Sequence, residues 1–295
     1  MQRPFFSQSP KRVGSGPLRP PISVVGPLAS PDAVSSPGAG CGSESGTATL
    51  LSFLFEVITE LCQMSDNPYS IIIVSGGDAE EFLQGQLTAD LRKCPSPGPM
   101  RAAWCNPKGR VICILAVSKT ADGFLLALPG ELAEHVVQRL TMFRFRSKVV
   151  FELRSANPDE LMDQDPQQEF AAWRLQRLCR GIAEIYGPQS EQFTPHMLNL
   201  DLLGAVDFEK GCYTGQEIVA RTHYRGASKR RLHRFRSEQP VAAGAKVAAG
   251  NRNVGEVVNA IGTDLLAVVP IDKVDASLTI GAIKLTHIAL DHLSV

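Results

Sequence analysis

The chain of 295 residues is 44% apolar and 20% charged, which is enough to build two or three lobes around a substantial core. Its 30 basic and 30 acidic residues cancel, so the field of the whole molecule is excluded as a source of attraction to nucleic acid, and any such affinity must come from a local patch. The seven cysteines form no CxxC pair and no zinc-like spacing with histidine, which indicates free thiols in a reducing compartment.

The amino end is compositionally distinct from the rest. Residues 1–46 are rich in Pro, Gly and Ser, which predicts disorder, and their basic, acid-poor character also fits an organelle transit peptide or an over-long gene start ahead of Met64. Residues 47–63 are the most apolar window, but Glu56 and Glu60 interrupt a stretch too short to span a bilayer. We therefore expect a packed amphipathic helix there and no association with membranes.

From residue 69 onward the pattern alternates between strand and helix periodicities. It predicts strands at 69–75, 100–105, 110–118 and 123–128 and helices at 79–91 and 131–141. The turns Asn106-Pro107-Lys108-Gly109 and Ala121-Asp122-Gly123 separate consecutive strands and are typical of hairpins. This order predicts an α+β lobe with an antiparallel sheet.

The second half is less regular. Residues 155–168 are polar and form a connector, 169–179 form a helix, and a further helix is expected from Gln216. From about Leu232, short apolar runs alternate with glycines, which indicates a small β-barrel.

The run 210–221, KGCYTGQEIVAR, is the strongest candidate for a site. It places Cys212 between Gly211 and Gly215, which free the backbone for a tight turn that would expose the thiol. Lys210 and the downstream Arg221 would favour the thiolate and raise its reactivity or its affinity for metal. The alternative is a loop cysteine without a role.

Around this cysteine lies the densest basic cluster of the chain. Eight cations between residues 210 and 236 face Glu217 alone, so the stripe could bind a phosphate backbone, with Arg225, Lys229, Arg230 and Arg231 as the leading candidates. It could equally be a solvated face whose charges pair with acids elsewhere.

Two further features are ambiguous on spacing alone. The turn holding Lys108 and Arg110 could bind an anion or be a plain hairpin turn, and Trp173 could pack in a core or stack on a flat heterocycle. The chain has no P-loop, no dinucleotide-binding glycine fingerprint, no GxSxG and no HExxH.

The segments together resemble one family. KGCYTGQEIVAR followed by Tyr224-Arg225-Gly226, with FLQGQLTAD at 82–90, NPKGR at 106–110 and NLD at 199–201, is similar to the folate-binding YgfZ-like proteins, relatives of the glycine-cleavage aminomethyltransferase. The resemblance covers about residues 66–295. It implies an aminomethyltransferase-like, multi-lobe folate-binding fold, with a folate-binding lobe at 47–154, a middle lobe at 155–231 that carries the cysteine motif, and a barrel at 232–295.

The resemblance also implies a function. It suggests a tetrahydrofolate-binding accessory protein that supports iron–sulfur client enzymes, such as the radical enzymes that thiolate tRNA, with Cys212 as the reactive or transiently iron-ligating thiol. Direct binding of tRNA by the stripe and folate-dependent one-carbon transfer are the alternatives, and turnover of its own is not expected. The implied compartment is the cytoplasm, or the mitochondrial matrix if the tail is a transit peptide.

By this resemblance the remaining motif residues acquire roles. Tyr69, Trp173, Lys108, Arg110, Asn199, Gln216 and Glu217 would hold the folate, while Lys210, Gly211, Tyr213, Gly215 and Arg221 would support the cysteine.

This sequence departs from the family pattern at three points, which limits the properties that the resemblance implies for it. Cys113-Ile114 stands where aminomethyltransferases carry an acidic pair, so the pocket is expected to lack the carboxylate that partners the folate amine. Tyr69 replaces one of two pocket tryptophans. Only 24 residues separate Lys148 from Trp173, which predicts a reduced middle lobe and a more open pocket.

Overall fold

The computed structural model describes residues 69–157, 160–161, 168–226 and 228–290. The predictions made for residues 1–46 and 47–63 lie outside the described residues. The described part of the chain begins with the first strand of a sheet.

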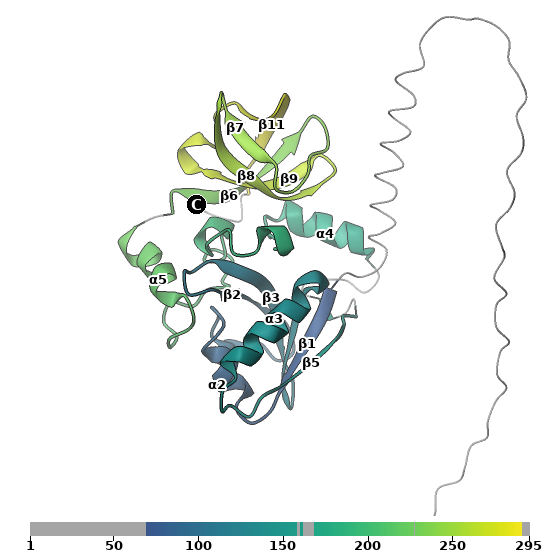
Figure 1. The fold of residues 1–295 in the computed structure, drawn as a ribbon. Helices are drawn as coiled ribbons and strands as arrows, with labels where there is room; N and C mark the ends of the chain where they lie inside the picture. The colour runs from purple at the N-terminus through teal and green to yellow at the C-terminus, as the bar shows by residue number, and fades with distance from the viewer. Residues whose placement is uncertain (1–68, 158–159, 162–167, 227, 291–295) are drawn as a thin grey trace, which may run out of the picture. The chain divides into compact units, whose positions relative to one another are not determined.

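That sheet is antiparallel and five-stranded, with the order β2-β3-β4-β1-β5. Its strands are β1 (Tyr69–Ser75), β2 (Pro99–Cys105), β3 (Val111–Lys119), β4 (Gly123–Pro129) and β5 (Val150–Ser155). Helix α3 (Gly130–Phe143) lies across the sheet and buries Leu132, Val136 and Leu140, which recur at the four-residue spacing of one helix face (Figure 1). The predicted strands, the hairpins and this helix are confirmed, with ends that differ by one or two residues.

The predicted helix at 79–91 is too long. Helix α2 (Ala79–Gln84) ends at Gly85, because the backbone N–H of Thr88 then donates to the carbonyl of Ala103 and Leu87 bridges Trp104. Pairing with the β2 edge therefore overrides helix propensity after Gly85.

The region between the sheet and the barrel contains helices and turns. Its elements are α4 (Phe170–Cys179), the 3₁₀ turns η3 (Gly187–Gln189) and η4 (His196–Leu198), and α5 (Gln216–Arg225). Where the structure describes residues 156–229, it contains no strand, in line with a reduced middle lobe. The predicted helices at 169–179 and from Gln216 are confirmed.

The carboxyl-terminal barrel is closed, with the order β10-β11-β6-β9-β8-β7 (Figure 1, green to yellow). Its strands are β6 (Arg230–Ser237), β7 (Lys246–Ala249), β8 (Arg252–Ile261), β9 (Asp264–Pro270), β10 (Leu278–Ile280) and β11 (Ile283–Ile288). Gly255 is required where β8 packs inside the barrel, because a Cβ there would lie 2.6 Å from Cγ1 of Val269. The predicted barrel is confirmed and starts at Arg230, two residues before Leu232.

The fold is therefore α+β, as predicted. One cluster of buried apolar side chains runs from Ile72 of the sheet through Leu198 and Leu200 to Val258 and Val268 of the barrel. The helical region thus shares a core with the sheet and is not packed separately. None of the helices in the described ranges is long and apolar enough to cross a membrane.

Candidate functional site: a buried aromatic and carboxylate pocket and an exposed thiol

Tyr69 and Trp173, which the sequence assigned to the cofactor, meet at one end of the sheet. Tyr69 begins β1 and Trp173 lies on the buried face of α4, and their ring centroids are 5.5 Å apart in an edge-to-face arrangement. Phe170 completes the cluster, 5.2 Å from Trp173. Edge-to-face packing of buried rings is favourable, so this aromatic cluster also contributes to the core.

Glu184 is the carboxylate at the centre of this pocket. It accepts hydrogen bonds from the hydroxyls of Tyr69 at 2.7 Å and Tyr186 at 2.8 Å and from Nε of Arg174 at 3.0 Å. Burial alone would raise the pKa of Glu184, but Arg177, Arg174 and the two tyrosine hydroxyls outweigh burial and hold that pKa below its usual value. The side chain is therefore a fully engaged carboxylate at neutral pH.

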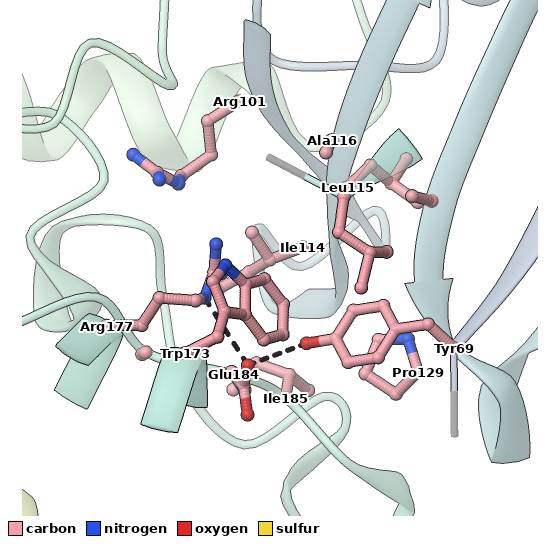
Figure 2. A pocket seen from close by; sticks show the side chains of 13 residues that line it. Tyr69, Arg101, Ile114, Leu115, Ala116, Pro129, Trp173, Arg177, Glu184 and Ile185 are labelled. Atoms are coloured by element: carbon pink, nitrogen blue, oxygen red, sulfur yellow. Dashed lines mark hydrogen bonds and ion pairs between the residues drawn. The ribbon is translucent and has the colours of Figure 1, made fainter. Parts of the chain in front are cut away.

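Two arginines bring positive charge to the same space. The guanidinium of Arg177 lies over the Trp173 ring at 4.7 Å, and its Nε is 3.4 Å from Oε1 of Glu184 in an ion pair without hydrogen-bond geometry. Arg101 reaches the pocket from β2, and Figure 2 shows its guanidinium on the side of Trp173 away from Glu184. The enclosed space is only about 20 Å³, room for about one water molecule.

The acidic pair is absent at Cys113-Ile114, as the sequence shows, yet this cavity contains another carboxylate, that of Glu184. Ile114, which stands at the position of the missing acid, lines the same cavity as Glu184. The carboxylate comes from the segment after α4 instead of from the sheet. Sequence reasoning missed Glu184, Arg101 and Arg177, although a single acid within the apolar run Ile182-Ala183-Glu184-Ile185 is a signal for a buried, paired carboxylate.

The other predicted folate ligands lie elsewhere. The residues lining the cavity in the described ranges do not include Lys108, Arg110, Asn199, Gln216 or Glu217. Asn199 is fully buried and donates to the carbonyl of Leu232, Arg110 donates to the carbonyl of Gln192, and Glu217 pairs with Arg221. These three side chains thus have partners within the protein, and their assignment to folate stays a prediction.

Cys212 lies at the surface on the loop before α5, the one exposed thiol of the five described cysteines. Gly215 is essential to this loop: its φ is +83°, and a Cβ would lie 2.4 Å from the carbonyl oxygen of Asn106. Gly211 has no such requirement, since a Cβ there would meet nothing within 4 Å. The prediction that both glycines shape the turn therefore holds for Gly215 and is wrong for Gly211.

Lys210 anchors the loop to the sheet lobe. Its ammonium donates to the carbonyls of Gln84, Leu87 and Ala89 at 2.7–2.8 Å. Burial lowers the pKa of Lys210 to about 8, although Asp90 and Asp207 oppose the shift, so the group is still charged at neutral pH. All three of its N–H donors are used by these carbonyls, so Lys210 holds the loop in place, while its influence on the thiol stays a prediction.

Two further support residues, Arg221 and Tyr213, and the predicted folate ligand Gln216 have partners within the motif. Arg221 forms an i,i+4 ion pair with Glu217 on the exposed side of α5, with 2.8 Å between Nη2 and Oε1. Tyr213 is buried beneath the ammonium of Lys210, 5.3 Å from its ring centroid. Gln216 is the first residue of α5, and its amide lies 3.5 Å from the carbonyl of Lys210.

Much of the basic stripe is already paired. Arg231 makes a two-bond ion pair with Asp201 at 2.8 and 2.9 Å, and Arg230 donates to the carbonyl of Val254 at 3.0 Å. Arg234 pairs with Asp264. Arg230 and Arg231 are therefore structural, which corrects their assignment to nucleic acid, while Arg225 and Lys229 are exposed.

The described residues contain no group of three or more His, Cys, Asp or Glu side chains placed to hold a metal ion. Cys212 by itself would supply one soft thiolate ligand. An iron–sulfur cluster at Cys212 would therefore need ligands from outside the described part of the chain or from another molecule.

Comparison with solved structures gives the class. Aminomethyltransferase T of the glycine cleavage system from Bartonella henselae superposes with a TM-score of 0.60 over 80% of this chain and 89% of that chain, at 15% sequence identity. The chain therefore has the aminomethyltransferase-like fold. A family model described as the C-terminal beta-barrel domain of CAF17 matches residues 229–293, which contain the closed barrel.

Sequence relatives narrow the class further. The tRNA-modifying protein YgfZ of Enterobacter sp. (strain 638) is 29% identical over 58% of this chain and 71% of the relative. The YgfZ of Escherichia coli O157:H7 (strain EC4115 / EHEC) is similar to the same extent, and an uncharacterized protein of Haemophilus influenzae is 28% identical over 66% of this chain and 83% of its own length. The resemblance to the YgfZ-like proteins is thereby confirmed.

Proposed function

We propose that this chain is a folate-binding accessory protein that supports iron–sulfur enzymes, including enzymes that modify tRNA, and that Cys212 is its reactive thiol. The relatives named as tRNA-modifying proteins and the aminomethyltransferase-like fold support this proposal. The observation that carries it is the exposure of Cys212 on a loop that Lys210 and Gly215 hold in place.

Folate would bind at the pocket of Tyr69, Trp173 and Glu184. Aromatic rings suit a flat heterocycle, a carboxylate suits its ring N–H donors, and Arg101 and Arg177 suit negative charge. Tetrahydrofolate, when bound, supplies a carrier for one-carbon units.

The chemistry of the pocket fits this group, but an enclosed space of about 20 Å³ does not admit a pterin unless side chains move. Glu184 already receives three hydrogen bonds and faces Arg177, so a ligand that uses it competes with these partners for the remaining acceptor position. Binding is therefore expected to move Tyr69 or Trp173. A transferase reaction is not favoured, since Glu184, the one carboxylate among the described residues of the pocket lining, already receives three hydrogen bonds.

The role of Cys212 would be to contribute one thiolate to iron or to a cluster in transit to a client enzyme. A soft thiolate at the surface is accessible to ligands supplied by a client or by a small thiol. Action in the cytoplasm, or in the mitochondrial matrix, is part of this proposal.

The test replaces Cys212 in a bacterial strain that lacks its own YgfZ. We expect Cys212→Ala to fold and to bind folate like the wild type, as measured by Trp173 fluorescence. It should fail to restore iron–sulfur enzyme activity in the strain. Cys94→Ala, a half-buried cysteine on another loop, is the matched control and should rescue. Full rescue by Cys212→Ala would refute the role of the thiol.

Direct binding of tRNA by α5 is a second candidate. Tyr224 is 67% exposed beside Arg221 and Arg225, and an exposed ring among cations can stack on an unpaired base. The double charge reversal of Arg225 and Lys229 to Glu should reduce the salt dependence of tRNA binding, whereas Arg252→Glu in the barrel should not. No measurable tRNA binding near physiological ionic strength would remove this candidate.

A further inference from the structure

The end of helix α3 and the loop after it expose several large apolar side chains. Within residues 142–148, here called the Phe145 loop, Phe145 is 94% exposed, Met142 67% and Phe143 42%. Large apolar side chains that are neighbours in sequence and also exposed are unusual in a soluble fold and mark contact surfaces.

The backbone of this loop is held by hydrogen bonds on both sides of Phe145. The N–H of Lys148 donates to Oδ2 of Asp78 at 2.7 Å, and the N–H of Ser147 donates to the carbonyl of Arg144 at 2.8 Å. Gly76 allows a close approach, because a Cβ on it would lie 2.1 Å from the carbonyl oxygen of Lys148. Phe145 therefore projects from a supported turn.

Phe145 itself adopts a φ of +45°, in the left-handed region that is unfavourable for a bulky residue. Neither burial nor core packing compensates for this cost, since the ring is in solvent. Strained positions of this kind cluster at sites of function.

The Phe145 loop is connected to the loop of Cys212. The ring of Phe143 meets Trp104 edge to face at 6.5 Å, and Nε1 of Trp104 donates to Oε1 of Gln86 at 3.3 Å. The hydroxyl of Thr214, two residues after Cys212, donates to the same Gln86 oxygen at 3.4 Å. Two side chains thus link the apolar loop to the segment that carries the exposed thiol.

The charges of the Phe145 loop indicate what kind of molecule could bind to it. Arg144, Arg146 and Lys148 alternate with the apolar residues, and no Asp or Glu occurs between Glu134 and Glu152. Phe, Met and Arg together are the composition enriched at protein–protein interfaces, and these exposed cations favour an acidic rim on the partner. A stack on RNA bases would use the rings but not Met142.

We infer that the Phe145 loop is the docking surface for a protein partner with an apolar pocket bordered by acidic residues, bound so that the partner also reaches Cys212. This inference rests on the proposed function, because the partner is then an iron–sulfur client. Phe145 would be the anchor that enters the pocket, and Arg146 would contact the acidic rim.

The experiment uses the full chain, Phe145→Ser, Arg146→Glu and two controls that make comparable changes elsewhere. The controls are Leu175→Ser on α4, an apolar residue at 37% exposure, and Arg252→Glu in the barrel. Each is assayed for rescue in the strain lacking YgfZ, for folate titration, and for binding to a purified tRNA-thiolating iron–sulfur enzyme. Both loop variants should lose rescue and bind the enzyme about tenfold more weakly or worse, with folate titration and both controls unchanged.

The same assays distinguish failure of the docking inference from failure of the proposed function. Rescue by both loop variants removes the docking surface and leaves the proposed function standing, whereas failure of the wild-type chain to rescue removes both. If both loop variants lose folate binding, the loop is needed for the folded structure and is not a docking surface.

The remaining occupants are tested with purified probes. If the loop variants lose binding to bulk tRNA, or to vesicles of phosphatidylcholine and phosphatidylserine, while enzyme binding persists, the occupant is RNA or a membrane and the inference is wrong. If the wild type is a dimer and Phe145→Ser converts it to a monomer, the occupant of the loop is a second copy of this chain and the inference is wrong.

Discussion

Gly215 lies directly against Gly109: a Cβ on Gly215 would come within 3.1 Å of the Cα of Gly109 and 2.4 Å of the carbonyl oxygen of Asn106. The side chain of Asn106 in turn accepts hydrogen bonds from the N–H groups of Lys108 and Arg110, which sets the shape of the turn. Two sequence motifs that are about a hundred residues apart thus form one rigid contact, and it positions the loop of Cys212.

The two glycines that flank Cys212 should therefore respond differently to substitution. Gly215→Ala places a side chain at a φ of +83° and against backbone, so we expect a loss of about 2 kcal/mol or more in the free energy of unfolding. Gly211→Ala should change it by less than about 0.5 kcal/mol. Urea unfolding of both variants checks this, and equal losses would contradict the assigned geometry.

The cysteines should differ in reactivity. Cys212 is exposed, whereas Cys105 and Cys113 are fully buried, and burial raises the pKa of Cys105 to about 12 and that of Cys113 further. Because the thiolate is the nucleophile, iodoacetamide should modify Cys212 in the native protein and the two buried thiols only after unfolding. Peptide mass spectrometry over a time course measures the order, and early modification of Cys105 would show that β2 opens.

Removal of the Tyr69 hydroxyl should destabilise the fold without loss of folate binding. Tyr69→Phe deletes a buried hydrogen bond to a charged acceptor, which is worth about 1.5–3 kcal/mol. It keeps the ring and frees an acceptor position on Glu184, so we expect folate affinity no weaker than that of the wild type. Tyr224→Phe, at an exposed tyrosine, is the control for stability; a tenfold weaker folate affinity in Tyr69→Phe would show that the hydroxyl itself binds the ligand.

The charge of Glu184 should be visible in the pH dependence of stability. Its folded pKa lies below the unfolded value of about 4.3, so its contribution is fully present above that value and is lost as the pH falls through the folded pKa. Glu184→Gln leaves Arg174 and Arg177 without their carboxylate and should cost about 3 kcal/mol near neutral pH.

Urea unfolding from neutral pH down to about pH 3.5 measures this effect, since that range spans the unfolded pKa. The wild-type free energy of unfolding should fall more steeply below about pH 4.3 than that of Glu184→Gln. Glu217→Gln, an exposed carboxylate, is the matched control and should follow the wild type. Parallel curves for the wild type and Glu184→Gln would mean that folding does not lower the pKa of Glu184.

Some of the site could be predicted because it depends on local pattern. The strand at 69–75, the hairpins and the helix beginning at Gln216 follow from periodicity and turn residues, and they are confirmed. The helix over 79–91 was predicted too long because pairing of residues 87 and 88 with β2 depends on residues about fifteen positions away. Periodicity within a window contains no information about that partner.

The candidate site likewise combines features that follow from local sequence with features that depend on distant residues. Residue types and spacing were enough to single out Cys212, whereas the family resemblance associated Tyr69 and Trp173 with folate. Whether a cation is free or paired depends on acceptors that are remote in sequence, such as Asp201 for Arg231 and the carbonyls near α2 for Lys210. The apparent charge of the basic stripe was therefore larger in the sequence than it is at the surface.

By itself the sequence determined the α+β class, the barrel, the family resemblance and the glycine-flanked cysteine, because these depend on residue type and on spacing along the chain. Only the tertiary structure decided that Glu184 supplies the pocket carboxylate, that Lys210 is an anchor, and that Phe145 is held in solvent near the loop of Cys212. Burial, hydrogen-bond partners and exposure are properties of residues brought together from distant positions, and packing alone sets them.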